Sequence, residues 1–163
     1  MPFNLRADAS TIPGPVYISS YAWGTDVPTG TGVLSLWNPI SSSVTACVMD
    51  MTVGAWNTGT TNASVTFELY KAVLVTPGTI ISINLFDALA PVSQVVSYAG
   101  GSWTLLSRVA VWNTNTKTSQ GHIPINLTTP MKISPGNGLV MVYATESANV
   151  TLFPNCSFTW YEV

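Results

Sequence analysis

The sequence predicts an all-β protein folded as a single-domain antiparallel jelly-roll β-sandwich. Strong helix formers are scarce, whereas Val and Thr, which favour strands, are abundant. Turn signals built from Gly, Pro and Asn recur at short intervals along the chain. Several runs between these turns alternate apolar with polar residues, which is the pattern of a strand with one buried face. Eight or nine such strands suit a jelly roll, and an immunoglobulin-like sandwich is the alternative.

The first five expected strands, in chain order, are set off by turn residues or by alternation. The first begins at Pro13-Gly14-Pro15, the second follows Thr29-Gly30-Thr31-Gly32, and the fifth follows Pro77-Gly78. The third and fourth strands alternate, with apolar residues such as Phe67 on one face and polar residues such as Glu68 on the other. These strands span 15–21, 32–37, 43–56, 63–74 and 79–86.

Four more strands are expected in the second half of the chain. They span 102–112, 121–127, 138–145 and 149–161. The closing strand places Phe158 and Trp160 on one face, with Ser157 and Thr159 on the other. Between the two groups of strands, the segment 86–96 could hold a helical turn, which Pro91 would keep short.

The tripeptide Trp-Asn-Thr occurs twice, beginning at Trp56 and at Trp112. Each copy follows a strand-like run and precedes residues that favour turns. We therefore interpret both copies as loops that leave a strand, with the tryptophan packed at the rim of the sandwich. A duplicated ligand site is the alternative interpretation.

Charge and hydropathy restrict the partners of the protein. Charged residues make up 7% of the chain and the formal net charge is −2, against a typical quarter of residues charged in soluble domains. The five cations are scattered, so no basic stripe for nucleic acid is expected. No apolar run reaches the roughly 18 residues of a membrane-spanning helix. A neutral surface of Ser, Thr and Asn instead favours packing against neighbouring proteins.

No residue pattern in the chain indicates catalysis, so we expect a protein that is not an enzyme. The single histidine, His122, has no carboxylate nearby in sequence. The carboxylates are isolated from one another; they are Asp8, Asp26, Asp50, Glu68, Asp87, Glu146 and Glu162. Metal-binding and phosphate-binding loops are absent from the sequence, and no cofactor or metal is expected. Cys47 and Cys156 are interpreted as two buried thiols, with a bridge between them as the alternative.

Six tryptophans are the most distinctive part of the composition. Aromatic side chains are enriched in protein cores and at subunit interfaces, which is the preferred interpretation. The candidate interface aromatics are Trp23, Trp56, Trp103 and Trp112. A glycan is the alternative ligand, since aromatic faces also stack on sugars.

The N-terminal residues 1–13 contain two prolines and little periodicity. We expect them to form an extended arm that becomes ordered on a neighbour, ahead of a sandwich domain at 14–163. The arm lacks the apolar core of a signal peptide, so synthesis in the cytoplasm is expected. Four sequons, at Asn62, Asn126, Asn149 and Asn155, are therefore given no weight.

Two segments carry a resemblance to a known family. GVLSLWNPISSSVTACVMDMTVG (32–54) resembles the strand, L-x-N-P, polar turn and long strand of small tailed-phage virion proteins. The C-terminal segment 124–163 is similar to the ending of that family, with a Pro-Gly turn, an apolar strand and a last strand closing on Thr-Trp-x-Glu at 159–162. These features also resemble TNF-like jelly rolls. The middle of the chain, 72–123, aligns with nothing.

The resemblance implies a non-enzymatic structural protein of a bacteriophage virion, made in the host cytoplasm. Its expected role is that of a capsid decoration or cement protein, or a related head or tail accessory subunit, that binds the major capsid protein or other virion proteins. A homotrimer is also implied, and the family has no catalytic residues to carry over. Three alternatives stay open: a receptor- or glycan-binding module of a tail fibre, a small-virus jelly-roll capsid subunit, and a secreted TNF- or C1q-like ligand.

Overall fold

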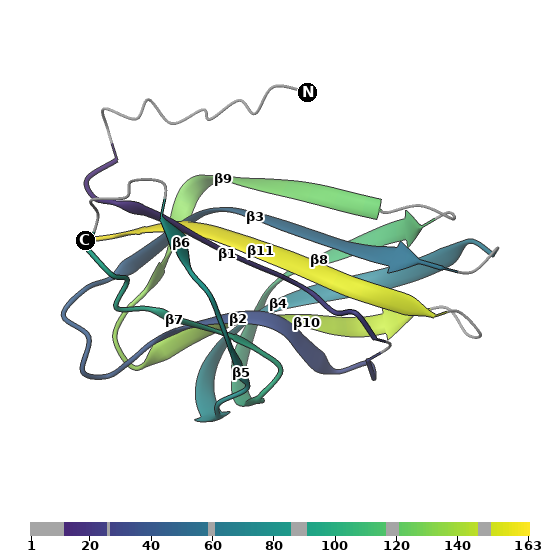
Figure 1. Ribbon diagram of the computed structural model, residues 1–163, viewed down its shortest axis with the longest axis horizontal. Coiled ribbons are helices and arrows are strands. Elements are labelled where there is room, and N and C mark those ends of the chain that lie inside the picture. Colours follow the sequence, from purple (N-terminus) through teal and green to yellow (C-terminus); the bar gives the residue numbers. More distant parts are fainter. Residues whose placement is uncertain (1–11, 26, 59–60, 86–90, 117–120, 147–150) are drawn as a thin grey trace.

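The computed structural model describes residues 12–25, 27–58, 61–85, 91–116, 121–146 and 151–163. Within these ranges the protein is all-β, with two antiparallel sheets packed face to face as a sandwich (Figure 1). This confirms the fold class that the sequence predicts. Most of the expected N-terminal arm, residues 1–11, lies outside the described residues.

Eleven strands make up the described sandwich. In chain order they are β1 (Val16–Ala22), β2 (Thr31–Asn38), β3 (Ala46–Asn57), β4 (Ala63–Thr76), β5 (Thr79–Ile81), β6 (Asn84–Leu85), β7 (Val96–Ala99), β8 (Ser102–Thr116), β9 (Gly121–Ile133), β10 (Asn137–Glu146) and β11 (Leu152–Glu162). Sheet A has the order β6-β1-β11-β3-β9, and sheet B has the order β5-β7-β2-β10-β4-β8.

The eight long strands pair in the order of a jelly roll. The first four pair with the last four in reverse, as β1–β11, β2–β10, β3–β9 and β4–β8. Successive pairs alternate between sheet A and sheet B. A folded ribbon of antiparallel pairs wound in this way forms the two Greek keys of a jelly roll. An immunoglobulin sandwich instead pairs its first two strands with each other.

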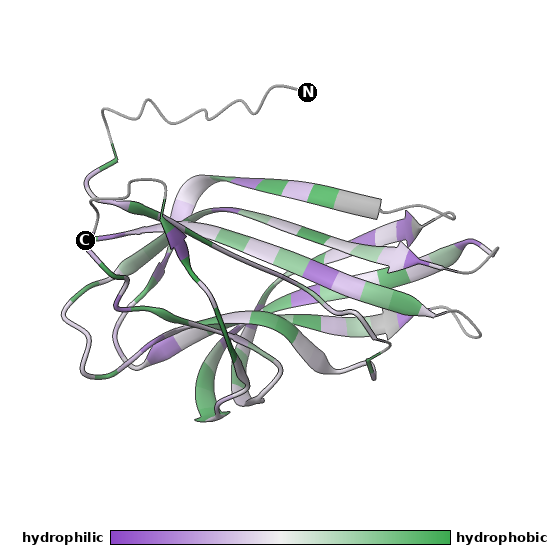
Figure 2. Cartoon of the chain, in the orientation of Figure 1, coloured by the Kyte–Doolittle hydropathy of each residue, from purple (hydrophilic) through white to green (hydrophobic). Residues whose placement is uncertain are grey.

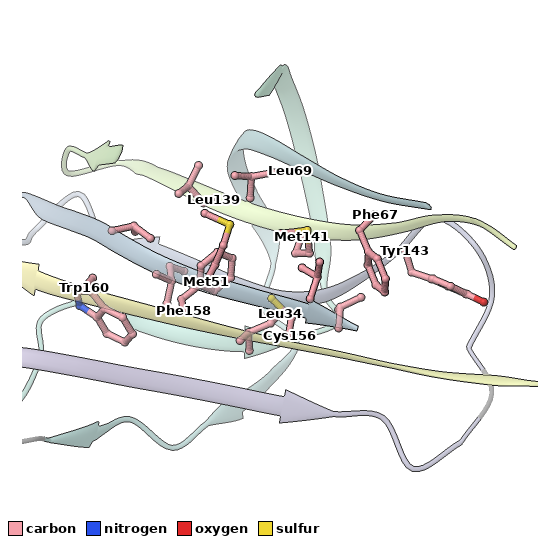
Figure 3. Close-up of a cluster of buried hydrophobic side chains, with 14 of the residues drawn as sticks. Leu34, Met51, Phe67, Leu69, Leu139, Met141, Tyr143, Cys156, Phe158 and Trp160 are labelled. Carbon is pink, nitrogen blue, oxygen red and sulfur yellow. The ribbon is translucent and has the colours of Figure 1, made fainter. Parts of the chain in front are cut away.

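The core lies between the two sheets and is built from alternate residues of the long strands. Figure 2 shows apolar and polar bands alternating along β9 and β11. The largest buried side chains include Trp160 and Phe158 of β11, Phe67 of β4 and Met51 of β3, which lie along the core in Figure 3. Burying each such side chain stabilises the fold by about 1.5–3 kcal/mol. The period-two pattern in the sequence therefore identifies the core face correctly.

Three strand predictions need correction. The expected strand 79–86 is two short strands, β5 and β6, separated by a break. The expected strand 121–127 continues to Ile133, because the second half of β9 pairs with Ala46, Cys47 and Val48 of β3. Strand β7 was not predicted at all, because its four residues carry no alternation long enough to recognise.

The segment 86–96, which was predicted to allow a helical turn, contains no helix where the structure describes it. Residues 86–90 lie outside the described residues, residues 91–95 contain no helix, and β7 begins at Val96. The segment is held by the C-terminal strand: the Glu162 carboxylate accepts hydrogen bonds from Ser93 Oγ and from the backbone N–H groups of Gln94 and Val95. The indole N–H of Trp160 donates to the same carboxylate over 3.4 Å. The Thr-Trp-x-Glu ending thus closes the loop before β7.

Sheet B rolls up at one end. Strand β7 lies beyond β2 and β8 lies beyond β4, yet only Gly100 and Gly101 join β7 to β8. The two edges of sheet B must therefore approach each other. The end of β4 curves away from the sandwich together with β5 (Figure 1). A Cβ added to Gly101 would lie 2.7 Å from the Thr76 carbonyl oxygen and 2.8 Å from the Gly78 nitrogen. Position 101 therefore requires glycine, because the turn at Gly100-Gly101 lies against the turn between β4 and β5.

The rolled end encloses a second, smaller apolar cluster on the outer face of sheet B. Ala72, Val140 and Val142 are buried there, with Tyr70 and Trp103 packed against them. The Trp103 ring lies over Gly138, where an added Cβ would come within 3.1 Å of the ring. A missing side chain at Gly138 therefore provides the space that the indole occupies.

Candidate interaction surfaces

Two of the four candidate interface tryptophans meet at the Gly100 turn. The Trp103 indole N–H donates to the Gly100 carbonyl over 3.3 Å, and the Trp103 ring packs edge-on against Trp37. The Trp23 ring lies 3.7 Å from the position of a Cβ at Gly100. The Trp23 indole N–H donates to the Val33 carbonyl over 3.3 Å. Both side chains thus already stabilise the rolled end of sheet B within one chain.

The second Trp-Asn-Thr copy lies inside a strand, so its interpretation as a loop is wrong. Trp112 pairs with Phe67 across β4–β8, and its partly buried ring packs against the main core. Strand β8 continues to Thr116, because Asn113 lies opposite Thr66 and accepts a hydrogen bond from the Thr66 hydroxyl over 2.7 Å. A cross-strand partner in the fold thus overrides the turn preference of Asn.

The first copy does end a strand, and its tryptophan is exposed. Strand β3 ends at Asn57, and 57% of Trp56 is accessible to solvent. Phe153 of β11 lies directly opposite, so both rings are on the outer face of sheet A. In the next row along the strands, Asn155 pairs with Gly54, which has no side chain. Trp56 and Phe153 therefore stand next to a position without a side chain, and we call these two residues the Trp56 platform.

The surface next to the Trp56 platform consists of neutral polar groups. Thr52 and Ser157 share a hydroxyl hydrogen bond of 2.7 Å. The Oδ1 atom of Asn155 is buried without a hydrogen-bond partner, and the residue is 8% exposed. A burial this complete also argues against glycosylation at the Asn155 sequon. Farther along β3, partial burial raises the pKa of the Asp50 carboxyl group.

A second surface lies along β8, the last strand of sheet B. Among the described residues β8 pairs with β4 alone, so its other side is a sheet edge. Four apolar side chains are exposed within seven residues of this strand: Leu105 by 45%, Leu106 by 58%, Val109 by 41% and Val111 by 42%. We call these four residues the β8 patch. These residues were not predicted as a surface, although a run of apolar residues at both even and odd positions is the signal that identifies such a strand.

The charge on β8 is neutralised by its neighbour strand. The Arg108 guanidinium donates to the Glu68 carboxylate over 2.8 Å, and the Tyr70 hydroxyl donates to the other oxygen over 2.5 Å. The Tyr70 hydroxyl and the Arg108 guanidinium lower the pKa of Glu68, and the carboxylate in turn raises the pKa of both partners. Glu68 is therefore a structural carboxylate that is already fully engaged.

The described residues offer no cluster for metal binding. In the ranges that the structure covers, no three His, Cys, Asp or Glu side chains come together. Cys47 and Cys156 are both free and buried, as predicted, and they point to opposite faces of sheet A. Burial raises the pKa of the Cys156 thiol well above its ordinary value, which suppresses the reactive thiolate. The side chain of His122 lies outside the described residues.

Fold and surfaces together define a β-sandwich protein with a jelly-roll strand order and two exposed apolar surfaces. The part of the chain that the structure describes contains no helix able to cross a membrane. Neither a protein-family model, nor a curated protein sequence, nor a solved structure matches this chain.

Proposed function

We propose that the protein is a non-enzymatic structural protein of a bacteriophage virion, acting as a capsid decoration or cement protein. The presence of two exposed apolar surfaces on one sandwich, the Trp56 platform and the β8 patch, is the observation that carries this proposal, because exposed apolar side chains are suited to docking. The jelly-roll order is also the one that the resemblance to small phage virion proteins implies. The residues of the two surfaces bind by shape and apolar contact, and they catalyse no reaction.

A cement protein acts by mass action. It binds the assembled shell but not the separated capsid subunits, so that every bound copy shifts the equilibrium toward the shell. Docking of this kind needs an interface of about 1,000 Å² or more. Many copies on a repeating lattice can each bind weakly and still hold the shell through multivalency. A homotrimer, which the resemblance implies, would present three docking surfaces, one on each chain.

The test uses undecorated capsids of the phage whose genome encodes the chain. Purified protein is added, and capsid disruption is followed during heating by light scattering. We expect stoichiometric binding and a higher disruption temperature, because the ligand binds the intact shell preferentially. Serum albumin at the same concentration serves as the control for nonspecific protection. Failure to co-sediment with the capsids would remove the cement function.

The Trp56 platform favours a second candidate function, that of a receptor- or glycan-binding module on a host-attachment structure. Its exposed aromatic ring offers an apolar face of the kind that stacks on sugars. In this case glycan-array binding is expected, and Trp56→Ala should reduce it by at least about tenfold. Trp112→Ala is not a suitable control, because that ring packs on the core. Ile40→Ala, which removes another exposed apolar side chain, should leave binding unchanged.

A further inference from the structure

The four edges of the two sheets differ in how they are protected against pairing with another chain. An exposed strand edge presents unpaired N–H and C=O groups, so proteins shorten it or place Pro or Lys in it. Sheet A ends on one side at β6, which has two residues, and sheet B ends on one side at β5, which has three. The other edge of sheet A is β9, which contains Pro124, Pro130 and Lys132.

Strand β8 is the one edge of the described sheets that is neither short nor marked by Pro or Lys, and two β-bulges are the protection that it has. It has 15 residues, the longest strand in the sandwich, and it contains neither Pro nor Lys. Its single charged residue, Arg108, is bonded to Glu68 of the same chain. Two irregularities in its pairing with β4 leave Leu106 and Val109 without a directly opposite residue. These two side chains belong to the β8 patch, so the irregular positions add apolar surface to the edge.

We propose that the β8 edge is a contact surface for a second copy of this chain, with the β8 patch at the centre of that contact. The four side chains of the patch are each 41–58% exposed, and the largest apolar patch on a protein surface is often functional. A stable contact buries about 800 Å² on each partner, so the patch would form its apolar centre and the polar residues around it the rim. Thr104 and Ser107, both exposed on the same strand, provide part of that rim.

The charge of the edge favours a copy of the chain as the occupant. The edge has no uncompensated charge of its own, so it requires no oppositely charged partner and does not repel an identical surface. Most soluble oligomers are assemblies of identical chains. The proposal does not depend on the cement function, because self-association and shell binding are separate measurements.

The experiment measures the mass of the full chain in solution by analytical ultracentrifugation, at high and low protein concentration. The wild-type chain should have a mass of several chains at high concentration. The double variant Leu106→Asp/Val109→Asp should weaken association by at least about tenfold, because it places charge at the centre of an apolar contact. The matched control is the double variant Ile40→Asp/Val92→Asp, which adds the same charge at side chains that are 85% and 87% exposed away from β8. This control should keep the wild-type mass.

Three outcomes would overturn the proposal: a monomeric wild-type chain at every concentration, a double variant with wild-type mass, or a control that dissociates equally. Circular dichroism checks that the double variant is folded. If it is not, hydrogen exchange of the wild-type chain decides, since the amides of residues 104–111 should exchange more slowly at high concentration. Equal exchange at both concentrations would reject the contact. A chain that self-associates through β8 but ignores capsids would reject the cement function alone.

Discussion

Glu162→Ala is expected to lower the free energy of unfolding by about 3 kcal/mol. The carboxylate of Glu162 is 8% exposed and accepts hydrogen bonds from Ser93, from two backbone N–H groups and from the Trp160 indole. Removing it takes the acceptor from the Gln94 N–H and the Trp160 indole, leaves Ser93 and Val95 with only the bonds between them, and releases the segment that leads into β7. Chemical denaturation at neutral pH measures the change, which corresponds to a drop of about 10 °C in Tm.

Two variants separate this network from a general effect of removing a glutamate. Glu68→Ala deletes a carboxylate whose partners face solvent on the outer face of sheet B, so it should cost far less. Ser93→Ala removes a single donor and leaves the carboxylate bonded to the others, so its effect should be intermediate. A Glu162→Ala protein whose unfolding free energy stays within about 1 kcal/mol of the wild type would show that the network contributes little.

Gly101→Ala is the second substitution with a large expected effect, again about 3 kcal/mol of destabilisation. The backbone of Gly101 has φ +84°, a value that residues other than glycine rarely adopt. The added methyl group would also lie 2.7 Å from the Thr76 carbonyl oxygen. Because both costs act where sheet B closes on itself, the Trp103 ring should lose its fixed position. Near-ultraviolet circular dichroism should therefore weaken along with stability.

Gly30→Ala is the matched control. Gly30 has φ +89°, but an added Cβ there meets nothing within 4 Å. It should cost only the backbone strain of about 1 kcal/mol and leave the near-ultraviolet spectrum unchanged. Equal losses in the two variants would mean that the close approach of the two turns contributes nothing, and that sheet B does not depend on it.

Several features of the fold follow from local sequence patterns. The alternation of Phe67 and Leu69 with Glu68 and Tyr70 predicts both the strand and its buried face, and the structure confirms both. The closing strand behaves likewise, since Phe158 and Trp160 fill the core as expected. Such patterns can be recognised because a strand reverses its side chains at every residue, whatever its neighbours are.

Other features depend on partners far away in the sequence and were missed or misread. Strand β7 is preceded by a segment that Glu162 holds, and the two are separated by almost 70 residues. The Asn-Thr of the second Trp-Asn-Thr copy stays in β8 because Thr66 and Val65 lie opposite. Among the candidate aromatics, Trp56 is the exposed one, whereas Trp23 and Trp103 bond to the backbone near the rolled end of sheet B.

By itself, the sequence determined an all-β sandwich of alternating strands, two buried thiols and the absence of any recognisable catalytic motif. Tertiary structure alone decided that β8 became the long apolar edge of sheet B and that Trp56 remained exposed. The physical reason is the range of the interactions: side-chain alternation is set within each strand, whereas the place of a strand in its sheet depends on pairing between residues distant in the chain.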